Sequence, residues 1–204
     1  MRIKNAVTFQ YYVYDICKKL IKKKSFDKVM DVGCGPPVKI KKLFDLSSLE
    51  LILIDQPSTE RMVKEILPCA RFFGLNLEDI EIDLNEKIHL IICCDVVEHL
   101  LDPDKCMIFI KNNLAVDGLA VISTPERDFR RGIECFSSTK KEHVREWNRH
   151  EFSMYVESHG FKIRDHRLLP QLRIRRLEYW ISRLFKDVIQ NSRWSSCQVV
   201  ICSL

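Results

Sequence analysis

Short apolar runs alternate along the chain with segments that repeat apolar residues every three or four positions. The continuous runs predict strands that are covered on both faces, as in a parallel sheet, and the periodic segments predict helices. Strands and helices that follow one another in this way favour an α/β domain with right-handed crossovers. Ligands of such a domain bind beyond the carboxyl ends of the strands.

The expected strands lie between turn-forming residues. They cover Lys28–Val32, Leu51–Ile54, Ala70–Leu75, Ile88–Cys94, Leu119–Ser123, Phe161–Arg167 and Gln198–Cys202. The expected helices cover about Val7–Lys24, Val38–Phe44, Thr59–Leu67, Lys105–Leu114 and Arg149–Ser158. A turn is expected at Asp117-Gly118, and a polar loop is expected to open at Thr124-Pro125.

A further apolar pattern falls between the last two expected strands. It is made of Leu177, Trp180, Ile181, Leu184, Phe185 and Val188. These spacings predict an amphipathic helix over Arg173–Gln190, in a helical insertion at about 171–194. Two roles stay open for this helix, which either packs on the domain or covers a substrate pocket.

Composition agrees with one globular domain that spans residues 1–204, because 46% of the residues are hydrophobic and 30% are charged. The nine cysteines are odd in number and contain no CxxC pair, so they indicate neither a zinc site nor a disulfide framework. Reduced cysteines, the lack of a signal-peptide pattern and the lack of a membrane-length apolar stretch predict a cytoplasmic protein.

The net charge of +5 raises the question of an acidic partner such as RNA or a membrane surface. The basic residues concentrate at Lys18, Lys19, Lys22, Lys23, Lys24, Arg173, Arg175 and Arg176. Runs of this kind are usually the solvated faces of helices, so the charge alone selects no partner.

Candidate chemistry collects where the expected strands end. Gly33 and Gly35 follow the first strand, and glycines let a turn bend sharply and bring backbone amides close to a ligand. Asp55 ends the second strand, 20 residues after Gly35, where a carboxylate can accept hydrogen bonds from both hydroxyls of a ribose. The turn and the carboxylate together predict a nucleoside site.

A dinucleotide enzyme would use a similar turn, but the third glycine of its fingerprint is absent. Val38 stands in that place, and Pro36 and Pro37 remove amide donors from the loop that would hold a pyrophosphate. A nicotinamide oxidoreductase is therefore disfavoured, and a cofactor without phosphates fits better.

Three segments resemble a known family. Asp31-Val32-Gly33-Cys34-Gly35 looks like the first motif of class I S-adenosylmethionine-dependent methyltransferases. Cys94-Asp95-Val96-Val97-Glu98-His99-Leu100, with Asp102-Pro103-Asp104, resembles the fourth-motif region of the small-molecule branch that includes ubiquinone-biosynthesis O-methyltransferases. Ser123–Asp128 and His143–Trp147, with Glu151-Phe152, resemble a subgroup linked to surface-polysaccharide or natural-product pathways. The resemblance covers roughly Lys28 to Phe161.

The resemblance implies a Rossmann-like three-layer sandwich with a mostly parallel seven-stranded sheet, an antiparallel last strand and helices on both faces. It implies that Gly33 and Gly35 line the methionine part of S-adenosylmethionine, that Asp55 binds the ribose, and that Asn76 and Leu77 lie beside the adenine. The full implied cofactor set is Asp31, Gly33, Cys34, Gly35, Asp55, Gln56, Asn76, Leu77, Cys94, Asp95 and Val96. Relatives usually carry aspartate at the position of Asn76, whose amide oxygen can still pair with the adenine edge.

His99 is the candidate base for a hydroxyl acceptor, because imidazole titrates near neutral pH and His99 closely follows the cofactor strand. A hydrogen bond from His99 to the adjoining loop or to the cofactor is the competing interpretation. The acceptor-side candidates are Glu126, Arg127, Asp128, His143, Arg145 and Trp147. Each of these has a structural alternative, and no metal-ligand set is assigned.

The sequence therefore predicts a methyltransferase that acts on a small molecule, with a hydroxyl of a sugar or biosynthetic intermediate favoured over a nitrogen. An RNA methyltransferase is the nearest rival, although the segment at Asp95 does not resemble the Asn/Asp-Pro-Pro-Tyr motif. A silent cofactor-binding protein is the other alternative, supported by Asn76. The acceptor, a metal requirement and the oligomeric state stay open.

Overall fold

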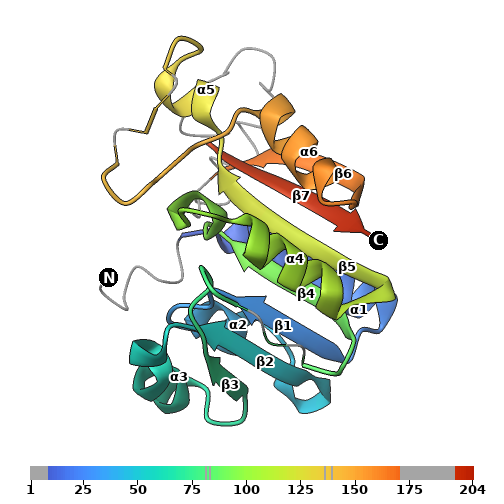
Figure 1. Ribbon diagram of the computed structural model, residues 1–204. Coiled ribbons are helices and arrows are strands. Elements are labelled where there is room, and N and C mark those ends of the chain that lie inside the picture. The colour runs from blue at the N-terminus through green and yellow to red at the C-terminus, as the bar shows by residue number, and fades with distance from the viewer. Residues whose placement is uncertain (1–8, 81, 83, 136, 139, 171–195) are drawn as a thin grey trace, which may run out of the picture.

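A computed structural model describes residues 9–80, 82, 84–135, 137–138, 140–170 and 196–204. These residues form a seven-stranded sheet in the order β3-β2-β1-β4-β5-β7-β6 (Figure 1). The strands are β1 (Lys28–Val32), β2 (Glu50–Asp55), β3 (Arg71–Gly74), β4 (Ile88–Cys94), β5 (Leu114–Pro125), β6 (Lys162–Leu169) and β7 (Cys197–Ser203). Neighbours from β3 to β5 pair in parallel, and β7 is antiparallel to β5 and β6. The predicted sheet, including its antiparallel last strand, is confirmed.

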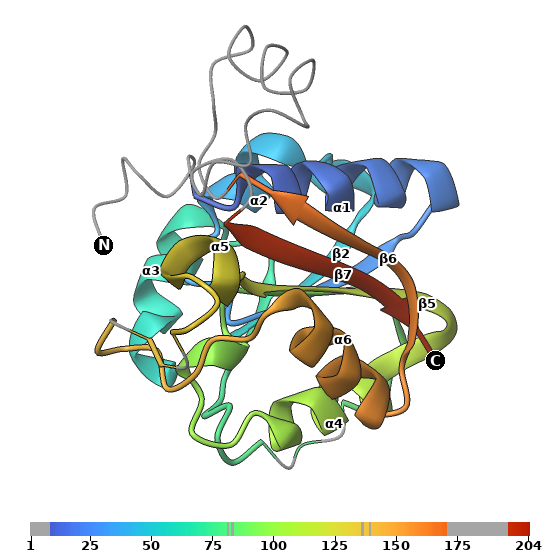
Figure 2. The same ribbon diagram turned by 90° about the horizontal axis from the view of Figure 1, so that it is seen from above.

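Helices cover both faces of the sheet (Figure 2). They are α1 (Tyr11–Lys24), α2 (Val38–Leu43), α3 (Glu60–Ile66), α4 (Asp104–Asn113), α5 (Arg127–Arg131) and α6 (Arg149–Ser158), and the short 3-10 turns are η2 (Leu46–Ser48), η3 (Pro57–Thr59) and η4 (Val97–His99). Val13 and Tyr14 of α1 belong to the core on one face, whereas Met107 of α4 and Phe152 of α6 belong to the core on the other. The predicted three-layer arrangement is thus confirmed, and the first predicted helix covers one face of the sheet.

The predicted turn at Asp117-Gly118 is wrong. β5 begins directly after α4, at Leu114, and continues to Pro125. Its register against β4 jumps from Ile88 opposite Leu114 to Leu90 opposite Leu119, so the intervening residues bulge out of the ladder. A Cβ at Gly118 would lie 2.9 Å from the carbonyl oxygen of Ile88, which shows that the glycine serves a close backbone approach within a strand.

The polar loop predicted after Pro125 is interrupted by the short helix α5, which begins two residues later. The Glu126 carboxylate caps this helix by accepting a 2.7 Å hydrogen bond from the amide of Phe129. Glutamate is not among the usual capping residues, so the pattern gave no helix start.

The helix predicted over Arg173–Gln190 and the insertion at 171–194 lie outside the described residues. The assignment of residues 1–204 to one domain stays a prediction. Among the helices that the structure describes, none has the length and apolarity needed to cross a lipid bilayer.

A capping box begins α6 and sets the position of its buried face. Asn148 Oδ1 accepts a 2.9 Å hydrogen bond from the Glu151 amide, and Glu151 Oε2 accepts one of 2.9 Å from the Asn148 amide. This arrangement satisfies two backbone donors that the first helical turn leaves free. One turn further on, Phe152 is fully buried.

We expect Asn148→Ala to lower the free energy of unfolding by about 1 kcal/mol, because the variant loses the side-chain cap. Chemical denaturation measures the change. Asn112→Ala is the matched control, since Asn112 is exposed near the end of α4, and its effect should stay within about 0.5 kcal/mol. Equal losses in the two variants would contradict the capping argument.

Candidate active site

The loop after β1 is held against the neighbouring strand β2. The amides of Gly33 and Cys34 donate to the carbonyl oxygen of Ile54 over 2.8 and 3.1 Å. Gly33 has a φ of +73°, and a Cβ there would lie 2.4 Å from Val96 Cγ2. Only glycine therefore fits between the two strand ends, and Val96 is placed directly against the loop.

The predicted ribose carboxylate lies at the same loop. Asp55 Oδ2 accepts a 2.6 Å hydrogen bond from the Gly35 amide, and Oδ1 accepts one of 2.7 Å from the Gln56 amide. Each carboxylate oxygen has a second lone pair, so both remain able to accept a ligand hydroxyl. A Cβ at Gly35 would meet no atom within 4 Å, which leaves open space in front of the loop.

Asp31 lies behind this loop as a buried carboxyl group with a single partner. It is 1% exposed, and Tyr14 Oη donates a 2.8 Å hydrogen bond to its Oδ2. Its Oδ1 has no hydrogen-bond partner among the described residues. Burial raises the pKa of Asp31 to about 7, although the Tyr14 hydrogen bond and the charge of Lys39 oppose the shift. A cationic group of a ligand would find an unpaired acceptor here.

Sequence reasoning missed the residues that α1 adds to this edge. Gln10 Nε2 donates to the carbonyl oxygen of Cys94 over 3.4 Å, and Lys39 Nζ lies 4.8 Å from the centre of the Tyr14 ring. Tyr14 lies within the first helix predicted from the sequence, which gave it no role in the site. Its hydroxyl was the available indication, since a buried tyrosine usually finds a polar partner.

The other predicted cofactor residues lie at the carboxyl ends of β3 and β4. Asp95 has a φ of +51°, and its Oδ1 accepts a 3.1 Å hydrogen bond from Ser123 Oγ. Asn76 is exposed and accepts a 3.2 Å hydrogen bond from the Glu78 amide, while Leu77 is buried. The strand ends thus bring the whole predicted set to one edge of the sheet.

The structure fits an adenosyl sulfonium at this edge. The Gly35 side is open, Asp55 has acceptor capacity for a diol, and Asp31 has an unpaired oxygen for a cation. Cys34 and Cys94 are buried, and burial raises the pKa of both thiols, so neither is an available nucleophile.

The candidate base lies beside a second histidine that is distant in sequence. His99 is exposed at the end of η4, and its Nδ1 lies 2.7 Å from the carbonyl oxygen of Glu142. The His99 and His143 rings meet edge to face with centres 4.7 Å apart. The Val144 amide donates a 2.8 Å hydrogen bond to the Glu98 carbonyl oxygen, which fixes the two segments together.

Glu98 is the buried member of this group. It is 0% exposed, its Oε2 accepts a 3.1 Å hydrogen bond from Thr124 Oγ1, and its Oε1 has no hydrogen-bond partner among the residues described. Burial, and then the nearby charge of Asp95, raise the pKa of Glu98. The predicted site omitted Glu98, although the motif that carries His99 contains it.

His143 is held by a carboxylate. Its Nδ1 lies 2.6 Å from Glu146 Oε1, and Glu146 also accepts hydrogen bonds from Arg131 and Ser138. Burial lowers the pKa of His143, and the Glu146 hydrogen bond opposes this shift only in part. Burial alone would raise the pKa of Glu146, but the bonds from Arg131, His143 and Ser138 outweigh it and hold the pKa low.

Two of the predicted acceptor residues have structural partners instead of free side chains. Arg127 donates to both carboxylate oxygens of Glu151 over 2.8 and 2.9 Å, and thereby joins α5 to α6. Glu126 caps α5 and accepts a 3.2 Å hydrogen bond from the Arg149 amide. These contacts favour the structural alternative for both residues.

Trp147 and Arg145 differ in exposure. Trp147 is 9% exposed and stacks on Tyr155 with ring centres 5.3 Å apart, as a packing residue does. Arg145 is exposed, donates a 2.9 Å hydrogen bond to the Leu101 carbonyl oxygen and lies 5.9 Å from the Trp147 ring centre. Of the predicted acceptor residues, His143 and Arg145 thus lie nearest to the segment that carries His99.

Comparison with protein families matches residues 5–166 to a family described as a methyltransferase domain. No curated protein matches the chain. Among solved structures, an S-adenosylmethionine-dependent methyltransferase from Clostridium acetobutylicum ATCC 824 is 12% identical with a TM-score of 0.66, over 100% of this chain and 94% of that one.

Two other solved structures are similar to this chain in fold. The methyltransferase domain of a bacterial Hen1 protein, CtHen1-C, is 18% identical with a TM-score of 0.65, over 95% of this chain and 96% of that one. The 1,6-didemethyltoxoflavin-N1-methyltransferase of Burkholderia thailandensis, solved with 1,6-didemethyltoxoflavin and S-adenosylhomocysteine, is 14% identical with a TM-score of 0.63, over 93% of this chain and 76% of that one. At these identities the likeness is one of fold.

The Tyr14 hydroxyl should stabilise the folded protein more at high pH than at low pH. The folded-state pKa of Asp31, about 7, lies above its ordinary value of 3.8. The stability that protonated Asp31 contributes is therefore fully present below pH 3.8 and is lost as the pH rises through about 7. Tyr14→Phe removes the donor that stabilises the ionised form.

We expect Tyr14→Phe to lower the free energy of unfolding by about 1.5–3 kcal/mol near pH 8, where the bond is to a charge, and by about 1 kcal/mol near pH 5. Denaturation at the two pH values measures the difference. Tyr155→Phe is the control, because the Tyr155 hydroxyl donates to Asp104, whose side chain is 58% exposed. A Tyr14→Phe loss that is the same at both pH values would contradict an ionising Asp31.

Proposed function

The chain belongs to the methyltransferase domain family and is an S-adenosylmethionine-dependent enzyme, and from this premise we propose that it methylates a hydroxyl group of a small molecule. The supporting observation is the pairing of the Gly35 amide with Asp55 beside open space, at the edge where η4 places His99. The proposed cofactor and acceptor residues then follow the carboxyl ends of the neighbouring strands β1, β2 and β4.

We assign the cofactor contacts to the strand-end residues predicted from the sequence. Gly33 and Gly35 would border the methionine part, Asp55 would accept from the ribose hydroxyls, and Asn76 and Leu77 would flank the adenine. Asp31 would face a positive charge through Oδ1, which has no other partner within the described residues. Gln56 contributes its amide to the orientation of Asp55.

S-adenosylmethionine supplies a methyl group on a sulfonium: the C–O bond forms as the C–S bond breaks, its electron pair stays on sulfur, and the hydroxyl proton leaves. The protein must hold the acceptor oxygen in line with carbon and sulfur. It must also accept the proton. Because His99 Nδ1 faces a carbonyl oxygen and therefore carries the hydrogen, Nε2 has the lone pair for this step.

Several observations support a small acceptor over RNA. Gln10, just before α1, contacts the carbonyl oxygen of Cys94, so the lysines that end this helix lie about 20 Å away, given a rise of 1.5 Å per residue. They belong to the opposite edge of the sheet. The Burkholderia neighbour binds 1,6-didemethyltoxoflavin, a small molecule.

All nine cysteines are free, which supports a reducing, cytoplasmic location as part of the proposal.

Calorimetry with S-adenosylhomocysteine tests the cofactor assignment. We expect Asp55→Ala to weaken binding by about 10- to 100-fold, which corresponds to the loss of hydrogen bonds to a charged group. Glu50→Ala is the matched control, since Glu50 is an exposed carboxylate at the other end of β2. Undetectable binding by the folded wild type, or unchanged affinity in Asp55→Ala, would refute the site.

The acceptor assignment is tested by release of S-adenosylhomocysteine with panels of hydroxyl compounds, nitrogen compounds and RNA. Turnover should appear with a small hydroxyl compound and should fall by about 100- to 10,000-fold in His99→Ala, while S-adenosylhomocysteine affinity is retained. His150→Ala, at an exposed position on α6, should leave turnover unchanged. Turnover with RNA alone would overturn the proposed acceptor class.

A further inference from the structure

Glu98, His99 and His143 form a group with the composition of a metal site. One carboxylate oxygen and one nitrogen from each ring lie within 4.8 Å of one another. Atoms that bind one ion tetrahedrally at about 2.1 Å lie about 3.4 Å apart, so binding requires these side chains to close by up to about 1.4 Å. Two imidazoles and a carboxylate suit first-row transition metals better than Mg²⁺ or Ca²⁺.

The surroundings orient both rings for ligation. His99 Nδ1 lies 2.7 Å from the Glu142 carbonyl oxygen, and His143 Nδ1 lies 2.6 Å from Glu146 Oε1. Each acceptor fixes the hydrogen on Nδ1 and leaves the lone pair on Nε2. Carboxylate and carbonyl partners of this kind are typical of metal-binding histidines, whose tautomer and direction they set.

Glu98 gives the second, independent observation. The side chain is fully buried, Thr124 holds only its Oε2, and Oε1 has no partner in the described part of the chain. An unpartnered buried oxygen is destabilising, and a bound cation would relieve that cost. Because His99 is exposed, coordination positions would remain open toward the acceptor.

We propose that Glu98, His99 and His143 bind one divalent first-row cation of the Mn²⁺ type, which holds and activates the acceptor oxygen. This inference rests on the proposed function for the acceptor, and it makes His99 a metal ligand instead of the proton acceptor. The cation would lower the pKa of the hydroxyl it contacts. The hydroxyl proton passes to water, the oxygen lone pair forms the bond to the methyl carbon, and the C–S pair stays on sulfur.

Lys140 offers a direct test, because its ammonium lies beside His143 Nε2, the nitrogen that would bind the metal. Lys140 Nζ lies 3.5 Å from His143 Nε2. A cation at this nitrogen must displace the ammonium and experiences its repulsion. We therefore expect Lys140→Met to bind Mn²⁺ several-fold more tightly than the wild type, an effect that a purely structural role of the histidines would not produce.

The experiment titrates the full chain, first treated with a chelator, with MnCl₂ and follows binding by calorimetry and by loss of the free Mn²⁺ electron-paramagnetic-resonance signal. Mn²⁺ is the probe because the nine free cysteines would compete for softer metals. We expect one Mn²⁺ per chain, with Mg²⁺ and Ca²⁺ bound more weakly. His99→Ala and His143→Ala should weaken Mn²⁺ binding at least about 10- to 100-fold, and Glu98→Gln should also weaken it.

His150→Ala is the control and should bind Mn²⁺ like the wild type. Because His99 is exposed, its variant should keep the thermal stability of the wild type. Wild-type protein that binds no Mn²⁺, or equal binding in His99→Ala and the wild type, would overturn the metal site. S-adenosylhomocysteine affinity, measured on the same samples, separates this failure from a failure of the proposed function.

Discussion

The two hydrogen bonds from the Gly33 and Cys34 amides to the Ile54 carbonyl oxygen hold the loop after β1, and the cofactor edge depends on them. They bend the chain across the end of β2, which brings the Gly35 amide to Asp55. They also place Gly33 against Val96, the residue that leads into η4. One bend thus sets the positions of Asp55, the proposed ribose-binding carboxylate, and, through Val96, of Glu98 and His99.

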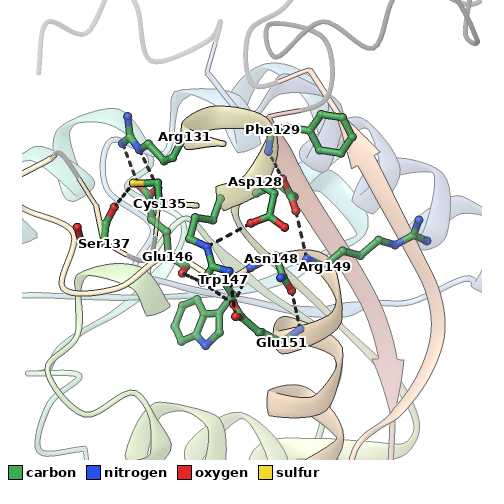
Figure 3. A network of polar contacts seen from close by, with 12 residues as sticks. Asp128, Phe129, Arg131, Cys135, Ser137, Glu146, Trp147, Asn148, Arg149 and Glu151 are labelled. Atoms are coloured by element: carbon green, nitrogen blue, oxygen red, sulfur yellow. Dashed lines mark hydrogen bonds and ion pairs between the residues drawn. The ribbon is translucent and has the colours of Figure 1, made fainter. Parts of the chain in front are cut away.

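Ion pairs between helices and loops, not strand pairing, hold the segments that carry the proposed acceptor residues. The bidentate Arg127–Glu151 pair joins α5 to α6, and Arg131 holds the buried carboxylate of Glu146 (Figure 3). Of the two pairs only Arg131–Glu146 is buried, since the Glu151 side chain is 41% exposed. Losing one partner of a buried pair is strongly destabilising, so the Arg131–Glu146 pair fixes geometry. Arg131 thereby holds Glu146 at its hydrogen bond to His143, whose ring meets that of His99 although the two histidines are far apart in the sequence.

The strand pattern, the glycine turn and the strand-end carboxylates could be predicted because each depends on neighbouring residues or on a fixed period. β4 shows this best, since its continuous apolar run is buried almost throughout. The bulge in β5 and the Glu126 cap depend on contacts with Ile88 and Phe129 that no local pattern encodes. The same limit applies to the site: Tyr14 and Glu98 acquire their roles only through packing, and Arg127 has an ion-pair partner on another helix.

Two carboxyl groups at one edge carry a burial cost that the rest of the fold does not relieve. Asp31 and Glu98 each have one oxygen bonded to a hydroxyl and one without a hydrogen-bond partner among the described residues. Burial raises the pKa of both, so each group is poised between a proton and a cation. Under the two proposals a positive ligand would replace the proton at each position, the adenosyl sulfonium or its ammonium near Asp31 and a metal ion at Glu98. The two unpaired oxygens are therefore the atoms at which both proposals place a positive charge.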